Sequence, residues 1–415
     1  MNQNEQIIRQ RAVLVGIDTG EYDLAQSLDE LAELADTAGA DTIGRFVQNR
    51  DSQDNATFIG GGKLKEIRDF CRENEVDLLI FDGELSGSQM RNIEDITEVS
   101  VVDRTMLILD IFAQRATSSE GKLQVELAQQ KYLLPRLIGL GTALSRQGGG
   151  IGTRGPGETK LESDRRHIRR RIAALEQELK ELERRRTLMR RRREKNEVPV
   201  IAIVGYTNVG KSTLLNKLTG SDIYVQNQLF ATLDPTAREL TLPDGQHAVI
   251  IDTVGLVQRL PHQLVEAFKS TLEVAAGADV ILNVCDYTNP LAYAQLEVTN
   301  NLLAELGCGD IPVITVYNKT DLAPILPEPE RLGKVVHISA KEGLGLDLLL
   351  QDICACLSES VEHLQLLLPY SEGALMDLIR RKGKILAENY EEHGIAVQAL
   401  LHKRYHWRVE PFLIR

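Results

Sequence analysis

The segment VPVIAIVGYTNVGKST, Val198–Thr213, decides the fold of this 415-residue chain. Its apolar half predicts a buried strand, and its glycine-containing half predicts a tight turn into a helix that begins near Lys211. A GxxxxGK[ST] pattern between a strand and a helix is typical of a phosphate-binding loop. Backbone N–H groups would surround a β-phosphate, Lys211 would reach the β- and γ-phosphates, and the Ser212 hydroxyl would bind Mg²⁺. The phosphate-binding residues predicted in this way are Gly205, Tyr206, Thr207, Asn208, Val209, Gly210, Lys211 and Ser212.

A second motif, DTVG at residues 252–255, ends the apolar run HAVIIDT. We expect Asp252 to hold a Mg²⁺-bound water and the Gly255 N–H to meet a γ-phosphate. Between the two motifs lies LFATLDPT, residues 229–236, where a threonine would complete the Mg²⁺ shell only in the triphosphate state and so make the segment a switch. Both Thr232 and Thr236 qualify, and spacing does not choose between them. The nucleotide-binding residues predicted here are Phe230, Ala231, Thr232, Leu233, Asp234, Asp252, Thr253, Val254 and Gly255.

Two more motifs, NKTD at residues 318–321 and SAK at residues 339–341, select the base. Asp321 would accept hydrogen bonds from the N1–H and the exocyclic amine of guanine, a donor pair that adenine lacks. An adenine nucleotide would leave this carboxylate unpaired, which disfavours ATP. The SAK segment would offer a backbone N–H to guanine O6. The base-binding residues predicted in this way are Asn318, Lys319, Thr320, Asp321, Ser339, Ala340 and Lys341.

The residue after DTVG is Leu256, where many signalling GTPases have a glutamine that orients the attacking water. Leucine cannot do so, and we expect slow GTP hydrolysis by the isolated protein and a faster rate once a partner or a cation completes the site. Asn208 resembles the loop asparagine of potassium-activated GTPases, which makes K⁺ a second candidate cofactor beside Mg²⁺. The alternative is that Asn208 only stabilises the loop by a hydrogen bond.

Strand-like and helix-like segments alternate on both sides of this motif set, among them the apolar run RAVLVGI at residues 11–17 and helical patterns at residues 24–38 and 263–275. Residues 198–357 predict a doubly wound α/β sheet, and residues 1–113 predict a smaller parallel α/β domain. The tail, residues 358–415, predicts a small α+β domain in which LQLLLPY and the later stretch ENYEEHGIAVQALLHKRYHWRVEPFLI form strands around a helix that begins near Glu372. In the first domain, GGGK at residues 60–63 would place N–H groups and a lysine at a helix N-terminus, where they attract an anion or simply form a capping turn.

Residues 114–197 differ from the rest of the chain in their net charge and in the spacing of their apolar residues. They hold 21 Lys and Arg against 11 Asp and Glu, although the whole chain has a net charge of -12. Their apolar residues repeat with the spacing of a coiled coil, which predicts an arm of two antiparallel helices. The predicted seam consists of Leu123, Leu127, Leu134, Leu137, Leu161, Ile168, Ile172, Leu175, Leu179, Leu182 and Met189.

A tip loop, residues 139–160, is predicted between the two helices and contains eight glycines. Glycine gives the backbone access to irregular surfaces and the scattered cations neutralise phosphates, so the tip suits folded RNA. The alternative is a solvated linker. The cations that we assign to RNA contact are Arg146, Arg154, Lys160, Arg165 and Arg166.

Composition excludes several classes of protein. No apolar run approaches the length of a membrane span, and the first residues lack the pattern of a secretory signal. The five cysteines include no CxxC pair. We therefore expect a cytoplasmic monomer without a disulfide framework and without a membrane partner.

The order of these parts resembles the HflX family of ribosome-associated GTPases. The resemblance rests on the tip GGGIGTRGPGETKLE, GYTNVGKST, LFATLDPT, DTVG and NKTD, and it covers essentially the whole chain. It implies that Thr232 and Ser212 are the two protein ligands of Mg²⁺, and that Lys211, Thr232, Gly255 and, with a monovalent cation, Asn208 serve catalysis. It further implies that the arm enters the large ribosomal subunit and contacts its rRNA. The GTP-bound form would split stalled or idle ribosomes, particularly under stress.

Two alternatives differ in class. A tRNA-modification GTPase shares Leu256 and Asn208, but that family typically ends in a CxGK motif and this chain ends in VEPFLIR. The other is a non-enzymatic scaffold whose coiled coil binds a protein partner and whose state is switched by GTP.

Overall fold

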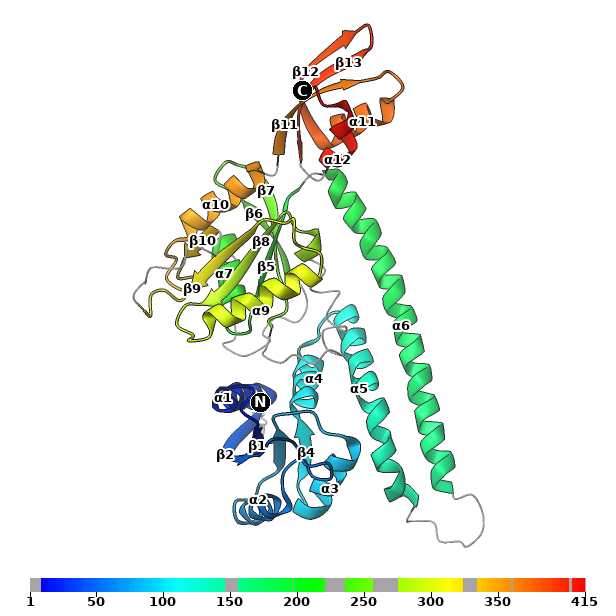
Figure 1. The fold of residues 1–415 in the computed structure, drawn as a ribbon, viewed down its shortest axis with the longest axis vertical. Coiled ribbons are helices and arrows are strands. Elements are labelled where there is room, and N and C mark those ends of the chain that lie inside the picture. The colour runs from blue at the N-terminus through cyan, green and yellow to red at the C-terminus, as the bar shows by residue number, and fades with distance from the viewer. Residues whose placement is uncertain are drawn as a thin grey trace, which may run out of the picture. The chain divides into compact units, whose positions relative to one another are not determined.

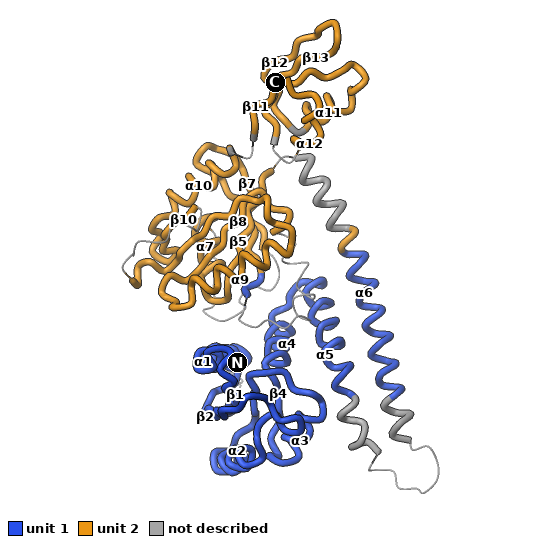
Figure 2. Tube along the Cα trace, viewed as in Figure 1, with its two compact units in different colours: residues 1–182, 226–234, 254–271 blue, residues 183–225, 235–253, 272–415 orange. Residues whose placement is uncertain are grey.

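The computed structural model describes residues 9–145, 156–196, 198–220, 236–256, 275–323, 334–359, 361–402 and 405–414, of which residues 138–145, 156–161, 185–196, 359, 361, 382 and 402 are described by their backbone alone. Figure 1 shows the helices and strands of these segments. The chain divides into two compact units (Figure 2), residues 1–182 with 226–234 and 254–271, and residues 183–225 with 235–253 and 272–415.

The first unit is built on a four-stranded sheet with the order β2-β1-β3-β4, in which every pair is parallel. Strand β1 is buried on both faces: Val13 and Val15 pack with Phe81 on one side, while Leu14 packs with Phe112 on the other. A strand covered on both faces reads as a continuous apolar run, which is why RAVLVGI predicts it. The elements are β1 Gln10–Asp18, α1 Leu24–Ala38, β2 Ala40–Asn49, α2 Gly61–Glu73, β3 Leu78–Phe81, α3 Gly87–Thr97, β4 Ser100–Asp103 and α4 Arg104–Arg115.

Two long helices follow, α5 Ser119–Ser145 and α6 Pro156–Asn196, and they run antiparallel in Figure 1. Glu126 of α5 accepts both guanidinium N–H groups of Arg171 at 2.6 and 2.7 Å. Between the helices Leu175 is fully buried, as the predicted seam requires. At about 1.5 Å per residue, the 41 residues of α6 span roughly 60 Å.

The connection between these helices is shorter than predicted. The sequence pattern placed a loop at residues 139–160, but α5 continues to Ser145 and α6 begins at Pro156. Proline at the first helical position lacks the N–H that would be unpaired there, and helices grow readily once begun. Residues 146–155, with the predicted RNA contacts Arg146 and Arg154, lie outside the described residues.

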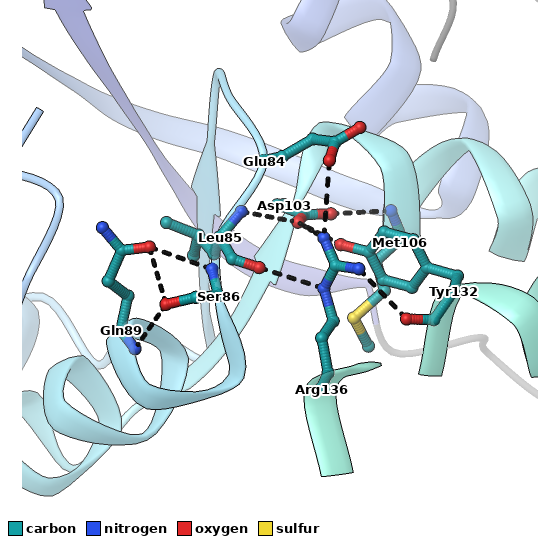
Figure 3. Close-up of polar contacts among 8 residues, drawn as sticks. All are labelled: Glu84, Leu85, Ser86, Gln89, Asp103, Met106, Tyr132 and Arg136. Carbon is teal, nitrogen blue, oxygen red and sulfur yellow. Dashed lines mark hydrogen bonds and ion pairs between the residues drawn. The ribbon is translucent and has the colours of Figure 1, made fainter. Parts of the chain in front are cut away.

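A buried polar cluster fastens α5 to the sheet of the first unit (Figure 3). The Tyr132 hydroxyl donates to the Asp103 carboxylate, which also accepts the Leu85 N–H at 2.9 Å. Arg136 donates from Nε to the Leu85 carbonyl at 3.0 Å, and its guanidinium stacks 3.4 Å from the centroid of the Tyr132 ring. Burial, together with the neighbouring Asp103 carboxylate, raises the pKa of the Tyr132 phenol far above its usual value. A Cβ at Gly87 would lie 2.2 Å from the Arg136 carbonyl oxygen, so α3 approaches α5 closely only because glycine is there.

The second unit contains a six-stranded sheet with the order β10-β9-β8-β5-β7-β6, parallel except that β6 is antiparallel to β7. This is the doubly wound sheet that the alternating pattern predicts. The helix expected at residues 263–275 falls almost entirely outside the described residues. The elements are β5 Val200–Gly205, α7 Lys211–Thr219, β6 Thr236–Thr241, β7 His247–Asp252, η1 Ala275–Gly277, β8 Val280–Asp286, α9 Ala292–Glu305, β9 Val313–Asn318, β10 Lys334–His337 and α10 Leu346–Glu359.

The second unit ends in a three-stranded antiparallel sheet with the order β11-β13-β12. The expectation of strands up to the last residues is wrong, because residues 406–412 form short helices. Pro411 has no N–H to give to a strand ladder, and the helical turn buries Val409 in the core of this sheet. The elements are β11 Val361–Leu368, α11 Gly373–Lys382, β12 Gly383–Glu391, β13 Gly394–His402, α12 His406–Val409 and η3 Glu410–Phe412.

Candidate nucleotide-binding site

The carboxyl ends of four parallel strands bring the sequence motifs to one edge of the second sheet. Strand β5 ends at Gly205, β7 at Asp252, β8 at Asp286 and β9 at Asn318. In open α/β sheets, ligands bind outside this edge. The motifs that begin at Gly205, Asp252 and Asn318 are 47 and 66 residues apart in the sequence, and parallel pairing is what makes them neighbours.

Two glycines of GYTNVGKS are required by the backbone. Gly205 has φ 144 and a Cβ there would lie 2.1 Å from the Val284 carbonyl oxygen, while Gly210 has φ 92 and a Cβ there would lie 2.3 Å from the Asn318 side-chain nitrogen. Any other residue would clash at both positions. Asn208 also has a left-handed backbone, with φ 61, and its side chain is exposed. Asparagine tolerates this conformation better than most residues, which gives it a structural use besides the predicted cation contact.

Lys211 begins α7 and is only 6% exposed. Its Nζ donates to the Gly205 carbonyl at 3.1 Å and to the Tyr206 carbonyl at 2.6 Å. Burial lowers the pKa of Lys211 to about 8, and the negative charge of Asp252 opposes that shift. The lysine is therefore held at the loop in a setting where any added negative charge would favour its protonated form.

Ser212 and Asp252 form an oxygen-rich pair beside this lysine. The Ser212 hydroxyl donates to Asp252 Oδ2 at 2.7 Å, and Asp252 is fully buried at the end of β7. A hydroxyl and a carboxylate are ligands of the kind that Mg²⁺ prefers. Among the residues that the structure describes, no group of three or more His, Cys, Asp and Glu side chains gathers at one point. A magnesium ion here would bind the Ser212 hydroxyl directly and Asp252 through a water, and would draw most of its other ligands from nucleotide and water, as is usual for this ion.

The switch segment falls largely outside the described residues. This holds for Phe230, Ala231, Thr232, Leu233 and Asp234. The other candidate threonine, Thr236, is the first residue of β6 and pairs with Asp252 across the ladder. The Thr253 side chain donates to the Ile203 carbonyl at 2.8 Å and ties β7 to β5. The boundary between the two compact units passes through DTVG, between Thr253 and Val254, so Gly255 belongs with the first unit.

Asn318 joins three of the motifs. Its side-chain nitrogen donates to the Val209 carbonyl in the phosphate loop at 2.8 Å, and its side-chain oxygen accepts the Ala340 N–H of SAK at 2.9 Å. Thr320 donates to the Ile338 carbonyl at 2.9 Å and fixes the NKTD loop to the end of β10. Sequence reasoning assigned Asn318 to the nucleotide and missed this bridging role. Asp321 and Lys341 are exposed, and Ser339 is buried.

The predicted RNA contacts on α6 are only partly described. Arg166 is exposed, as are most of the described cations of this helix, Arg165 is half-buried, and the Lys160 side chain lies outside the described residues. None of the helices in the described parts of the chain combines the length and the apolar character that crossing a membrane requires.

Comparison with protein-family models gives three matches along the chain. Residues 25–113 match the family described as GTP-binding GTPase N-terminal, and residues 115–193 match the GTP-binding GTPase middle region. Residues 200–319 match the family described as 50S ribosome-binding GTPase.

Comparison with individual proteins covers nearly the whole chain. The GTPase HflX of Caldanaerobacter subterraneus subsp. tengcongensis is 52% identical over 98% of this chain and 94% of its own length. The GTPase HflX of Escherichia coli K12 is 41% identical over 93% of this chain and 92% of its own. A solved structure, a GTP-binding protein from Sulfolobus solfataricus in complex with GDP, is 26% identical with a TM-score of 0.48, covering 84% of this chain and 99% of that one. The 52% and 41% identities to these two GTPases HflX, each over more than nine tenths of both chains, show that the chain belongs to the HflX family of GTPases.

Proposed function

We propose that the protein, in its GTP-bound form, binds the large ribosomal subunit and dissociates stalled or idle ribosomes into subunits, and that hydrolysis then releases it. The observation that carries this proposal is the 52% identity to a GTPase HflX over 98% of the chain. The match of residues 200–319 to a family described as 50S ribosome-binding GTPases supports the choice of subunit.

The nucleotide site suits a triphosphate switch. Lys211 would carry its proton beside the β- and γ-phosphates, the Ser212 hydroxyl would bind Mg²⁺, and Asp252, which accepts from Ser212, would hold a water of that ion. Thr232 would add a contact that exists only with the γ-phosphate. Gly255 would offer its N–H to the same group. A switch changes the population of conformations only through such differential contacts.

Slow hydrolysis follows from the residue after DTVG. Leu256 has no group that could orient a water, so the GTP-bound state lasts until a partner supplies the missing contact. This is useful for a dissociation factor, since GTP must survive until the protein has reached its target. K⁺ bound beside Asn208 is a second candidate activator. Equal rates of GTP hydrolysis in matched KCl and NaCl buffers, with and without ribosomal subunits, would show that K⁺ is not an activator.

The arm suits contact with rRNA. Exposed arginines occur along the described part of α6, Arg166, Arg169 and Arg170 among them. Clustered exposed cations are the expected electrostatic signature of a phosphate-binding surface. We propose a division of labour in which residues 114–197, with the tip at 139–160, dock on RNA and residues 198–357 hold GTP. In this account residues 1–113 and 358–415 are supporting domains, and the protein works in the cytoplasm as a monomer.

The test is co-sedimentation with isolated large subunits in the presence of a non-hydrolysable GTP analogue. Replacement of Arg165 and Arg166 by glutamate is expected to abolish pelleting with the subunits while GDP affinity stays unchanged. The matched control reverses two exposed cations of α2, Lys65 and Arg72, and is expected to bind normally. Normal pelleting of the arm variant, or equal loss in the control, would refute the assignment of the arm to RNA.

A further inference from the structure

The end of β8 carries a carboxylate that none of the GTPase motifs includes. We propose that Asp286 is a positioning residue for guanine-nucleotide binding: it holds the Lys319 side chain of NKTD in place, so that the lysine stem forms a preformed wall of the base pocket. This goes beyond the ribosomal function proposed above and does not depend on it.

The first observation is the ion pair itself. Lys319 Nζ lies 2.6 Å from Asp286 Oδ2, and the two side chains are 29% and 16% exposed. The neighbouring pair in the SAK loop, Lys341 with Glu342, is separated by 3.9 Å and is 83% and 53% exposed. A short pair that is largely shielded from water restrains a lysine, whereas a long exposed one does so weakly.

The second observation is that Asp286 is itself fixed. Its Oδ1 accepts the Thr288 N–H at 2.9 Å and the Thr288 hydroxyl at 2.7 Å. The next residue, Tyr287, donates its N–H to the Asn318 carbonyl at 2.9 Å, which ties the end of β8 directly to NKTD. With one carboxylate oxygen used in the turn, the other is directed at Lys319.

The third observation is a packed aromatic layer beside this pair. Tyr287 meets Tyr317 edge-to-face at 5.5 Å between ring centroids and His337 at 5.4 Å, and Tyr317 stacks on His337 at 5.5 Å. Tyr287 directly follows Asp286, and Tyr317 directly precedes Asn318. Aromatic packing on both strands keeps the two strand ends in register with each other.

The fourth observation is the backbone of Lys319, which has φ 65. A left-handed backbone is unfavourable for lysine and persists where the surroundings impose it. Here the residues on both sides are held, Asn318 through the phosphate loop and SAK, and Thr320 through the Ile338 carbonyl. Because the backbone of NKTD is held in this way, much of the remaining conformational freedom of the motif lies in the long Lys319 side chain. The ion pair with Asp286 restricts that side chain.

The chemical consequence concerns binding rather than turnover. A nucleotide that meets an already ordered lysine stem does not have to order it on binding, which strengthens the binding of GDP and GTP alike. The ion pair joins the end of β8 to NKTD, and neither of its two residues belongs to the sequence GYTNVGKS. The pair is therefore expected to change nucleotide affinity and the KM for GTP without changing kcat.

The experiment is a double-mutant cycle on the full chain, with GDP affinity measured by titration calorimetry. Asp286→Asn is expected to raise the Kd for GDP and the KM for GTP about three- to tenfold, with kcat at saturating GTP unchanged. Asp286→Glu keeps the charge and is expected to restore most of the affinity. Glu342→Gln, which breaks the exposed pair in the SAK loop, is the matched control and is expected to leave the Kd unchanged.

The cycle separates positioning from a merely structural role. In a Lys319→Met background the ion pair is absent, so Asp286→Asn is expected to change the Kd by less than about twofold. An unchanged Kd in the single variant, or an equal loss of affinity in both backgrounds, would overturn the proposal. If Asp286→Asn does not fold, the Lys319→Met and Asp286→Glu variants test the proposal instead. A Lys319→Met protein that binds GDP as tightly as the wild type also overturns the proposal.

Discussion

Nucleotide binding should take up a proton, because the phosphate-loop lysine is buried before any phosphate reaches it. Burial lowers the pKa of Lys211 from 10.5 to about 8. The phosphates of GDP would place negative charge beside Nζ and raise that pKa again, so the bound lysine is protonated throughout the neutral and mildly alkaline range. A group that binds more protons in the complex than in the free protein makes affinity fall as pH rises through its free pKa.

The magnitude follows from the pKa. With a free value of about 8, roughly a quarter of a proton is taken up per GDP at pH 7.5, half at pH 8 and three quarters at pH 8.5. Relative to its neutral plateau, the Kd for GDP rises about twofold at pH 8 and about tenfold at pH 9. The same shift makes the free protein less stable at neutral pH than it would be with an unshifted lysine. The unfolded chain keeps the Lys211 proton up to about pH 10.5 and the folded chain only up to about pH 8. The free energy of unfolding therefore rises with pH between these two values.

The assay is titration calorimetry with GDP at pH 7.5, 8 and 8.5, each in two buffers of different ionisation enthalpy, whose difference gives the number of protons. Guanine keeps its N1 proton in this range, and the exposed Lys341→Met variant, which removes a neighbouring lysine at the base loop, is expected to show the same uptake. Proton uptake that is absent at pH 8.5, or that does not increase with pH, would refute the reasoning about Lys211.

Three further predictions concern single residues. Gly205→Ala would place a Cβ 2.1 Å from a carbonyl oxygen of β8, so we expect thermal melts to show at least about 3 kcal/mol of destabilisation, and we expect GDP binding to be lost. The control is Gly309→Ala, which has open space around its Cβ and should melt as the wild type does. Tyr132→Phe removes the hydroxyl that Asp103 accepts, and should destabilise the first unit by about 1–3 kcal/mol in urea unfolding while the Kd for GDP stays within about twofold; unchanged unfolding would contradict the role given to this cluster. Asp321→Asn should weaken GDP binding by at least about 100-fold and favour a xanthine nucleotide in competition titrations, and retention of guanine preference would show that the base is read elsewhere.

The strands and the order of the motifs could be predicted from the sequence because both are local patterns. The run HAVIIDT is apolar up to its last polar residues, and Asp252 does end a buried strand. The helix expected from Leu24 to Ala38 has those bounds, since it starts after an aspartate cap and stops at a glycine with φ 91. The meeting of the motifs at one edge then follows from parallel pairing, which strand–helix alternation already implies.

The polar interior could not be predicted, because its partners are far apart in the sequence. Tyr132 and Asp103 are 29 residues apart, and Asp286 and Lys319 are 33 apart. An aspartate after a strand or an arginine in a helix is ordinarily solvated, so Asp103 and Arg136 gave no local signal of burial.

Dissociation of intact ribosomes tests the central claim most directly. Light scattering of purified ribosomes would be followed after addition of the protein with GTP, with a non-hydrolysable GTP analogue or with GDP, alongside a variant that lacks residues 139–160. The account predicts splitting with GTP and with the analogue, slower recycling of the protein with the analogue, and no splitting with GDP or by the deletion variant. Absence of splitting with the analogue, or normal splitting by the deletion variant, would contradict it.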